Sequence, residues 1–182
     1  MQAKIFLIGF RATGKTGAGK ALAKTLGCDF WDLDERITAK EGASVKEMVS
    51  SQGWEYFRQR ERAVLKEAVS APGPMVVACG GGAVMHEDLW PEIKRSSMVV
   101  WLRARPETIL KRLGSDPNTD ALRPALIQSK TLKEEVESTL AARGPLYKKW
   151  ADHEIWTDGR RIGEIVAELT HLLQRSRQKD RG

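Results

Sequence analysis

Short runs of consecutive apolar residues recur along the chain and predict buried β-strands. The clearest runs are Lys4–Gly9, Met75–Cys79 and Met98–Leu102, and weaker ones lie at Phe30–Asp34 and His153–Thr157. The three clearest runs scarcely alternate between apolar and polar positions, which is typical of strands that are covered on both faces in a parallel sheet. We therefore expect a central, mostly parallel sheet of five strands.

Between these runs, apolar residues recur at helical spacing. The clearest apolar stripe lies near the end of the chain and consists of Ile162, Ile165, Val166, Leu169, Leu172 and Leu173. Such a stripe covers one face of a helix with 3.6 residues per turn. Other helical patterns cover residues 17–26, 54–69, 87–94, 106–113 and 131–150. Because strands and helices alternate, the sequence predicts a three-layer α/β domain in which helices flank the sheet.

The chain has 182 residues, of which 41% are hydrophobic, and this composition fits one folded domain. It excludes a disordered chain, a disulfide scaffold and a collagen-like repeat. We expect the domain to span residues 1–175. Residues 176–182 are rich in basic side chains and contain no aromatic residue, so we expect a solvated, disordered tail and not an arm that binds nucleic acid.

The charge balance is mildly positive, with 30 Lys and Arg against 24 Asp and Glu and a formal net charge of +6. Such a field favours anionic ligands such as nucleotides and carboxylates. Cys28 and Cys79 lie far apart without metal-ligand spacing, which predicts free thiols in a reducing compartment. No stretch has the apolar length of a signal peptide or a membrane span, so we expect a cytoplasmic protein without a membrane partner. We also expect a monomer.

The strongest motif is Gly9–Thr16 (GFRATGKT), which matches G-x-x-x-x-G-K-[ST] between the first predicted strand and the first predicted helix. Glycines let backbone N–H groups point at a phosphate, and the N-terminus of the following helix adds partial positive charge. We expect Lys15 to reach the β- and γ-phosphates and the Thr16 hydroxyl to ligate Mg²⁺. The motif predicts a nucleoside triphosphate site and leaves the acceptor open.

Two carboxylates, Asp32 and Asp34, follow the first predicted helix. A spacing of two would place both on one side of the predicted strand, and the strand would end near the phosphate loop if it neighboured the first strand. One carboxylate could then hold Mg²⁺ through water and the other could accept a hydrogen bond from an attacking hydroxyl. Taken alone, an Asp-x-Asp pair also fits a surface turn.

A further polar pair, Arg58 and Glu61, lies one helical turn apart. It is either an exposed ion pair or an arginine that Glu61 holds in place to bind a substrate carboxylate in bidentate fashion. Gly80–Gly82 follow a predicted strand and offer backbone N–H groups that a ligand can approach closely, although a loose turn is the alternative. Trp54 either lines the same pocket or belongs to the core.

In their order and spacing, these motifs resemble the shikimate kinase family over roughly Lys4–Leu173. The resemblance is carried by Gly9–Thr16, Asp32-x-Asp34, Phe57-Arg58-x-x-Glu61, Gly80–Gly82, Arg123-Pro124 and Arg143-x-Pro145-Leu146-Tyr147. It implies a P-loop kinase of the nucleoside monophosphate kinase type. The implied reaction is phosphorylation of the 3-hydroxyl of shikimate by ATP with Mg²⁺, in the chorismate route to aromatic amino acids.

The resemblance also implies roles for individual side chains on the acceptor side. Asp34 would hold ring hydroxyls and orient or deprotonate the attacking one. Arg58 and Arg143 would bind the substrate carboxylate, with help from the backbone of Gly80, Gly81 and Gly82. The small acceptor and ATP would be the only binding partners.

On the nucleotide side, the resemblance implies that Thr16, and Asp32 through water, hold Mg²⁺. Segment 114–126 would be a mobile lid that brings Arg123 to the transferring phosphoryl group, and its polar, turn-rich composition suits that task. Lys15, Asp34 and Arg123 would be the catalytic set. The residues that would bind ATP are Ala12, Thr13, Gly14, Lys15, Thr16, Gly17, Arg112, Arg123 and Arg160.

The chain departs from the family's usual pattern at two positions. Ala12 stands where the family often has glycine, which matters if the loop needs positive φ at that position. Ala125 stands where a leucine usually follows Arg123-Pro124, so the packing of the lid is expected to be looser.

Two other readings compete with this one. A gluconate or nucleoside monophosphate kinase would not need Arg58 and Arg143 to converge, and a nucleotide acceptor would need a roomier site. A nucleotide-binding switch without catalytic activity would not need Lys15, Asp34 and Arg123 together.

Overall fold

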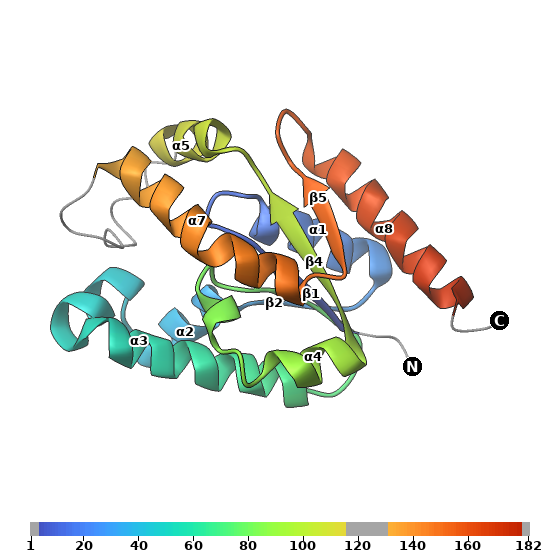
Figure 1. The fold of residues 1–182 in the computed structure, drawn as a ribbon. Coiled ribbons are helices and arrows are strands. Elements are labelled where there is room, and N and C mark those ends of the chain that lie inside the picture. Colours follow the sequence, from blue (N-terminus) through green and yellow to red (C-terminus); the bar gives the residue numbers. More distant parts are fainter. Residues whose placement is uncertain (1–3, 116–130, 180–182) are drawn as a thin grey trace.

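Five parallel strands form a single sheet in the order β2-β3-β1-β4-β5 (Figure 1). The computed structural model describes residues 4–115 and 131–179. From one edge to the other, the strands are β2 (Asp29–Asp32), β3 (Met75–Ala78), β1 (Lys4–Ile8), β4 (Ser97–Arg103) and β5 (His153–Trp156). The predicted parallel sheet is confirmed.

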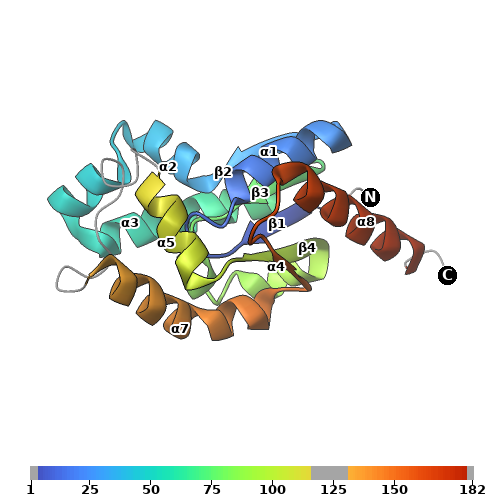
Figure 2. The same ribbon diagram turned by 90° about the horizontal axis from the view of Figure 1, so that it is seen from above.

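Helices cover both faces of this sheet, as Figure 2 shows from above. Helices α1 (Lys15–Leu26) and α8 (Ile162–Lys179) lie on one face. On the other face lie α2 (Leu33–Glu41), α3 (Val45–Ser70), the 3₁₀ turn η1 (Ala83–Met85), α4 (Trp90–Ser96) and α7 (Leu132–Trp150). Helix α5 (Pro106–Ser115) follows β4 and packs against α7. The predicted three-layer α/β architecture is therefore confirmed.

Alternating side chains of the central strand explain why its sequence is apolar throughout. Ile5 and Leu7 pack toward α1 and α8, whereas Phe6 and Ile8 pack toward α2, α3, α4 and α7. All four are buried. A polar residue at any of them would face apolar neighbours on either side of the sheet, which costs free energy unless it finds a hydrogen bond.

Aromatic rings fasten the second helical layer to the sheet. The Trp90 ring meets Phe6 edge-on at 6.4 Å between centroids and stacks on Trp150 at 6.2 Å. Trp101 of β4 lies 5.4 Å from Tyr147 of α7. These contacts hold α4 and α7 in place, and α7 carries one of the predicted substrate ligands, Arg143.

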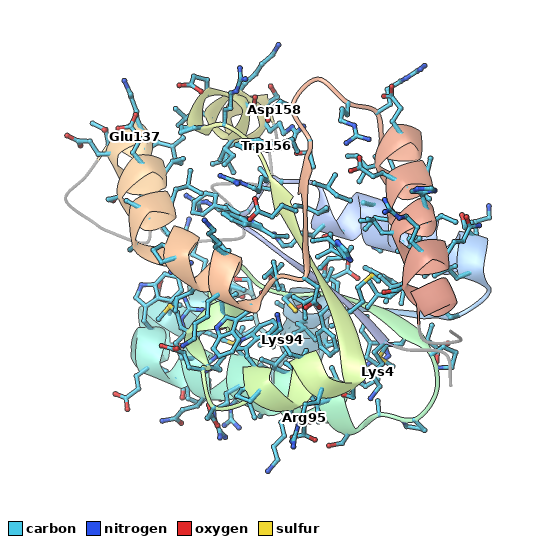
Figure 3. The ribbon with its side chains drawn as sticks, turned by 45° about the vertical axis from the view of Figure 1, so that its right-hand side comes forward. Lys4, Lys94, Arg95, Glu137, Trp156 and Asp158 are labelled. Carbon is cyan, nitrogen blue, oxygen red and sulfur yellow. The ribbon has the colours of Figure 1, made fainter. Side chains whose placement is uncertain are left out.

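The carboxyl ends of the strands all meet at one edge of the sheet. Figure 3 shows Trp156 and Asp158 at this edge, beside α5, and Lys4 at the opposite one. Trp156 remains 45% exposed, and the Arg103 guanidinium lies 4.2 Å from its ring. The phosphate loop leaves β1 at this carboxyl edge, where open α/β sheets bind their ligands.

The structure corrects the predicted environment of the two neighbouring carboxylates. Strand β2 ends at Asp32, whose side chain caps α2 by accepting hydrogen bonds from the backbone N–H groups of Asp34 and Glu35. Asp34 therefore lies in the first turn of a helix and not on the strand. In addition, β2 pairs with β3 and not with β1.

Two predicted boundaries also differ. Helix α5 extends to Ser115, so the first two residues of the predicted lid 114–126 are helical, and the remainder, with Arg123, lies outside the described residues. Helix α8 extends to Lys179, so the predicted tail 176–182 begins as helix. Within the described ranges, no helix is long and apolar enough to cross a bilayer.

A single glycine bends α3 so that its second part passes the carboxyl edge of the sheet. The helix starts with a capping box between Ser44 and Glu47 and is interrupted at Gly53, where φ is 83° and ψ is 170°. This conformation is almost restricted to glycine. After the break, the helix carries Trp54, Phe57 and Arg58 toward one pocket.

We expect Gly53→Ala to lower the free energy of unfolding by about 1 to 3 kcal/mol, because alanine is strained in this conformation. No atom lies within 4 Å of the added Cβ, so the effect would come from the backbone alone. The matched control is Gly163→Ala in α8, which also adds a Cβ into open space. It should raise stability by up to about 1 kcal/mol. Urea denaturation measures both, and equal effects would contradict the strained break.

Candidate active site

The phosphate loop wraps around the side chain of Lys15. The Lys15 ammonium donates hydrogen bonds to the backbone oxygens of Gly9 (2.9 Å) and Phe10 (2.6 Å), and the residue is only 9% exposed. The Thr13 hydroxyl donates to the Phe10 oxygen at 2.8 Å. The loop thus holds a positive charge at its centre and continues into the N-terminus of α1, an arrangement that favours a bound phosphate.

Ala12, which stands where the family often has glycine, adopts a left-handed backbone conformation. Its φ is +60°, and no other non-glycine residue among those described has positive φ. This conformation costs an alanine about 1 kcal/mol. Arg112 of α5 donates to the Ala12 oxygen (3.0 Å) and also to the hydroxyl (3.0 Å) and backbone oxygen (2.6 Å) of Thr157. Arg112 therefore supports the strained part of the loop from the side of β5.

Thr16 and Asp32 form a pair of oxygen donors beside the loop. The Thr16 hydroxyl donates to Asp32 Oδ2 at 2.6 Å, while Asp32 Oδ1 caps α2. Both residues line the same cleft. Hydroxyl and carboxylate oxygens are the ligands that Mg²⁺ prefers, and a substrate phosphate usually supplies further ligands. The donor set therefore fits a magnesium ion.

Two cavities meet at the carboxyl edge of the sheet. The larger is a cleft that runs along the phosphate loop and α2 and encloses about 1910 Å³ of empty space, including space open to solvent. The smaller pocket encloses about 410 Å³ by the same measure and lies between α3, α7 and the Gly80–Gly82 turn. Four residues line both cavities: Arg11, Asp34, Val45 and Gly81.

A buried carboxylate holds Arg58 at the wall of the smaller pocket. Glu61 is 1% exposed and accepts a hydrogen bond from Arg58 Nη1 at 2.6 Å. His86 Nε2 lies 3.1 Å from the same carboxylate oxygen. Burial alone would raise the pKa of Glu61, but the hydrogen bond from His86 and the charge of Arg58 outweigh it and hold the pKa below its usual value. Glu61 is thus ionised and orients Arg58.

Arg143 reaches the same pocket from α7. Its Nη1 donates to the Gly81 oxygen at 3.1 Å, and the Tyr147 hydroxyl donates to the same oxygen at 2.5 Å. Burial lowers the pKa of Arg143; Tyr147 opposes that shift and the neighbouring Arg58 adds to it. Burial also raises the pKa of Tyr147 to about 12. Two guanidinium groups therefore share one confined pocket, which favours an anionic ligand.

The glycine turn makes room for these charged groups. A Cβ on Gly82 would lie 2.0 Å from Arg58 Nη1, and a Cβ on Gly80 would lie 2.6 Å from Glu61 Oε1 and 2.9 Å from Asp34 Oδ1. Any side chain at these positions would displace the guanidinium or the carboxylates. The turn thus brings Arg58, Glu61 and Asp34 against bare backbone.

The profile of the family described as shikimate kinase matches residues 11–174. The chain is also 40% identical over 173 residues to shikimate kinase 2 of Yersinia enterocolitica, a match that covers 95% of this chain and 97% of that one. The chain belongs to the shikimate kinase family. A solved shikimate kinase from Acinetobacter baumannii, in complex with shikimate, superposes with a TM-score of 0.88 at 31% identity and covers 97% of this chain and 95% of its own.

A more distant solved structure resembles this chain in fold alone. The gluconokinase from Sinorhizobium meliloti superposes with a TM-score of 0.60 at 18% identity, covering 98% of this chain and 95% of that one. The shared architecture is that of P-loop kinases of the nucleoside monophosphate kinase type. The acceptor is therefore decided by the pocket and not by the fold.

The structure brings most of the predicted site residues together. The cleft is lined by Ala12, Gly14, Lys15, Thr16, Gly17 and Asp32 of the predicted nucleotide and metal sets. The pocket is lined by Asp34, Arg58, Gly81, Gly82 and Arg143 of the predicted acceptor set. Thr13 and Gly80 line neither cavity. Thr13 donates its hydroxyl to the Phe10 oxygen within the phosphate loop, and Gly80 lies close to Glu61.

Two further predicted nucleotide ligands do not line the cleft in the described structure. Arg112 contacts the phosphate loop from outside, as described above. Arg160 is bound by α8, through Glu168 at 2.6 Å and the Glu164 backbone oxygen at 3.0 Å. Arg123 lies outside the described residues. These three stay predictions.

Sequence analysis left Trp54 open and missed two other side chains at the site. Trp54 lines the pocket, against Phe57 and 5.3 Å from the Arg58 guanidinium, and it also packs against the core, so each of the two interpretations is partly right. His86 was given no role and contacts Glu61. Arg11 was passed over, although a charged side chain within a phosphate loop is itself a signal of contact with ligand or with a buried partner.

The ionised Glu61 leads to a pH-dependent prediction. Its pKa is lower in the folded chain than the ordinary value of 4.5, so its contribution to stability is present above about pH 4.5 and is lost as the pH falls through the folded pKa. We expect Glu61→Gln to lower the free energy of unfolding by about 3 kcal/mol near neutral pH, and we expect this difference to shrink below about pH 4.5. Denaturation at a series of pH values measures it.

The control for this series is Glu55→Gln, which changes an exposed glutamate of the same helix. It should leave stability unchanged across the pH range. A loss in Glu61→Gln that is the same at every pH would contradict an ionised, paired Glu61.

Proposed function

We propose that this member of the shikimate kinase family transfers the γ-phosphoryl group of ATP to the 3-hydroxyl of shikimate. The products would be shikimate 3-phosphate and ADP, a step in the formation of aromatic amino acids. One observation carries the proposal: Arg58, Arg143 and Asp34 line a single pocket that opens beside the phosphate loop. The chemistry of an anionic ring with hydroxyl groups matches this arrangement.

The two guanidinium groups are suited to the carboxylate of the acceptor. Arg58 donates one guanidinium nitrogen to Glu61, and Arg143 donates one to the Gly81 oxygen. These hydrogen bonds fix the orientation of both guanidinium groups. Both guanidinium groups retain N–H donors that can bind an anion. A carboxylate held by two arginines would leave the hydroxyl side of the ring directed toward Asp34, at the border with the nucleotide cleft.

Asp34 and Lys15 would act on the two ends of the reaction. The acceptor oxygen forms a bond to the γ-phosphorus while the bond from that phosphorus to the β,γ-bridging oxygen breaks, and ADP leaves. Asp34 would orient the attacking hydroxyl and accept its proton. Lys15 would exchange its hydrogen bonds to the Gly9 and Phe10 oxygens for phosphate oxygens and balance the negative charge on the departing ADP.

Thr16, and Asp32 through water, would hold Mg²⁺. When bound, the ion neutralises charge on the β- and γ-phosphates. The Asp32 carboxylate also caps α2, the helix whose first turn carries Asp34. One carboxylate therefore supports both the metal position and the position of the general base.

The finer predictions from the sequence belong to the same proposal. Arg123 would neutralise charge on the phosphoryl group, and Arg112 and Arg160 would lie near the adenine. We also propose that the protein works as a cytoplasmic monomer without nucleic-acid or membrane partners. The absence of aromatic residues from the basic segment 176–182 supports the lack of a nucleic-acid partner.

Product identification tests the proposed function. The purified protein is incubated with Mg·ATP and, in separate reactions, with shikimate, gluconate or a nucleoside monophosphate, and the products are identified by mass spectrometry and ³¹P NMR. We expect phosphate transfer to shikimate alone, because the pocket is much smaller than the nucleotide cleft and carries two guanidinium groups. Transfer to another acceptor but not to shikimate would overturn the proposal, and ATP binding without any transfer would indicate a switch.

Two substitutions should separate catalysis from substrate binding. Asp34→Asn should lower kcat by about 10² to 10⁴-fold with a small change in the KM for shikimate, because it removes the proton acceptor. Arg143→Lys should instead raise the KM for shikimate by about tenfold or more, because lysine cannot reproduce the fork.

The matched control for these variants is Arg60→Lys. Arg60 lies on α3 near Arg58, but its side chain is exposed and pairs with Glu41. Steady-state kinetics should show wild-type kcat and KM for this variant. Near-normal turnover in Asp34→Asn would remove Asp34 from the mechanism.

A further inference from the structure

Arg11 occupies the border between the acceptor pocket and the nucleotide cleft. It is the second residue after Gly9 in the phosphate loop, and it lines both cavities together with Asp34, Val45 and Gly81. Within the described residues, it is the only arginine or lysine that lines both. A group passing from ATP to an acceptor in the pocket must cross this border.

The Arg11 side chain is held in a position that is costly for a cation. It is 12% exposed and forms an ion pair with Glu135 of α7, which is 2% exposed. Taking two charges out of water costs several kcal/mol per ion, roughly, and a hydrophobic pair of similar size is often at least as stable. Stability therefore gives little reason to place a charged pair here.

Only part of the guanidinium is used by this ion pair. Arg11 Nη2 donates to Glu135 Oε1, whereas Nε is buried and has no hydrogen-bond partner among the described residues. The guanidinium also lies 5.7 Å from the Phe10 ring, which restricts its orientation. A buried donor without a partner costs about 1 to 3 kcal/mol. A ligand oxygen at the border could instead accept from the guanidinium donors that Glu135 does not use.

We propose that Arg11 is a further catalytic residue, which binds oxygen atoms of the phosphoryl group during its transfer. The inference rests on the proposed function. As the acceptor oxygen bonds to the γ-phosphorus and the bond to the β,γ-bridging oxygen breaks, negative charge remains on the three other phosphoryl oxygens. Lys15 meets this group from the phosphate loop, and Arg11 meets it from the side of the acceptor. Glu135 keeps the Arg11 cation in place without using all of its donors.

The test compares variants of Arg11 and Glu135 in steady-state kinetics with Mg·ATP and shikimate. Arg11→Met should lower kcat at least 100-fold while both KM values change less than about threefold, because the contact is made mainly in the transition state. Arg11→Lys keeps the positive charge but loses the planar guanidinium group, so its kcat should lie between those of the wild type and Arg11→Met. Glu135→Gln removes the charge of the partner but keeps the arginine, and it should lower kcat by less than about tenfold.

The matched control is Glu137→Gln on the same helix. Figure 3 shows Glu137 on the outer face of α7, and its side chain is 49% exposed. This variant should behave as wild type. Thermal unfolding and calorimetric titration with shikimate establish for each variant that the chain is folded and binds the acceptor.

Chemical rescue separates catalysis from a structural role. Millimolar guanidinium chloride should raise the kcat of Arg11→Ala, because the ion can occupy the vacated site, and it should leave Glu135→Gln unchanged. If Arg11 served only to attach α7 to the phosphate loop, Arg11→Met and Glu135→Gln would lower kcat equally and guanidinium would rescue neither. That pattern, or wild-type kcat in Arg11→Met, would overturn the inference.

The design keeps this inference distinct from the proposed function. If the wild-type protein phosphorylates a different acceptor in the product assay, shikimate is replaced by that acceptor and the same comparison of variants decides the role of Arg11. If no acceptor yields product, both proposals fail together. If shikimate is phosphorylated equally well by wild type and Arg11→Met, only the Arg11 inference fails.

Discussion

The acceptor site depends on one buried carboxylate that remains ionised. Glu61 is almost fully buried, so its charge persists only because Arg58 and His86 both contact it. Arg58 in turn depends on Glu61, because the same carboxylate fixes the orientation of its guanidinium group. Around this pair, Gly80 and Gly82 leave no room for a side chain. Much of the pocket's local sequence is thereby explained by one electrostatic requirement.

Local patterns predicted the parts of the fold that depend on local physics. The strands are continuous apolar runs in the sequence because helices cover both faces of the sheet. The phosphate loop was recognisable because its backbone needs glycines at defined positions. The positive φ of Ala12 was suggested only by the resemblance, because the family often has glycine at that position. Helix α2 was missed because only Leu33 and Ile37 of its nine residues are buried, which leaves too little apolar periodicity to detect.

The features that escaped prediction join residues far apart in the chain. His86 meets Glu61 across 25 residues, and Arg11 meets Glu135 across 124. Neither pair has a local spacing that marks it, since the contacts arise from the order of strands and the packing of α7 on the sheet. The position of Asp34 was mistaken for a related reason: the Asp32 side chain ends β2 by capping a helix, which the alternation of a strand does not reveal.

Trp54 gives the molecule an optical reporter of its own. Trp90, Trp101 and Trp150 are buried in the core, and Trp31 and Trp156 do not line the acceptor pocket, whereas the Trp54 indole lies in that pocket beside the Arg58 guanidinium. Emission from an indole responds to nearby charge and to water. We therefore expect a ligand whose carboxylate binds Arg58 to alter the charge and hydration around this ring, and with them the intrinsic fluorescence of the unlabelled protein.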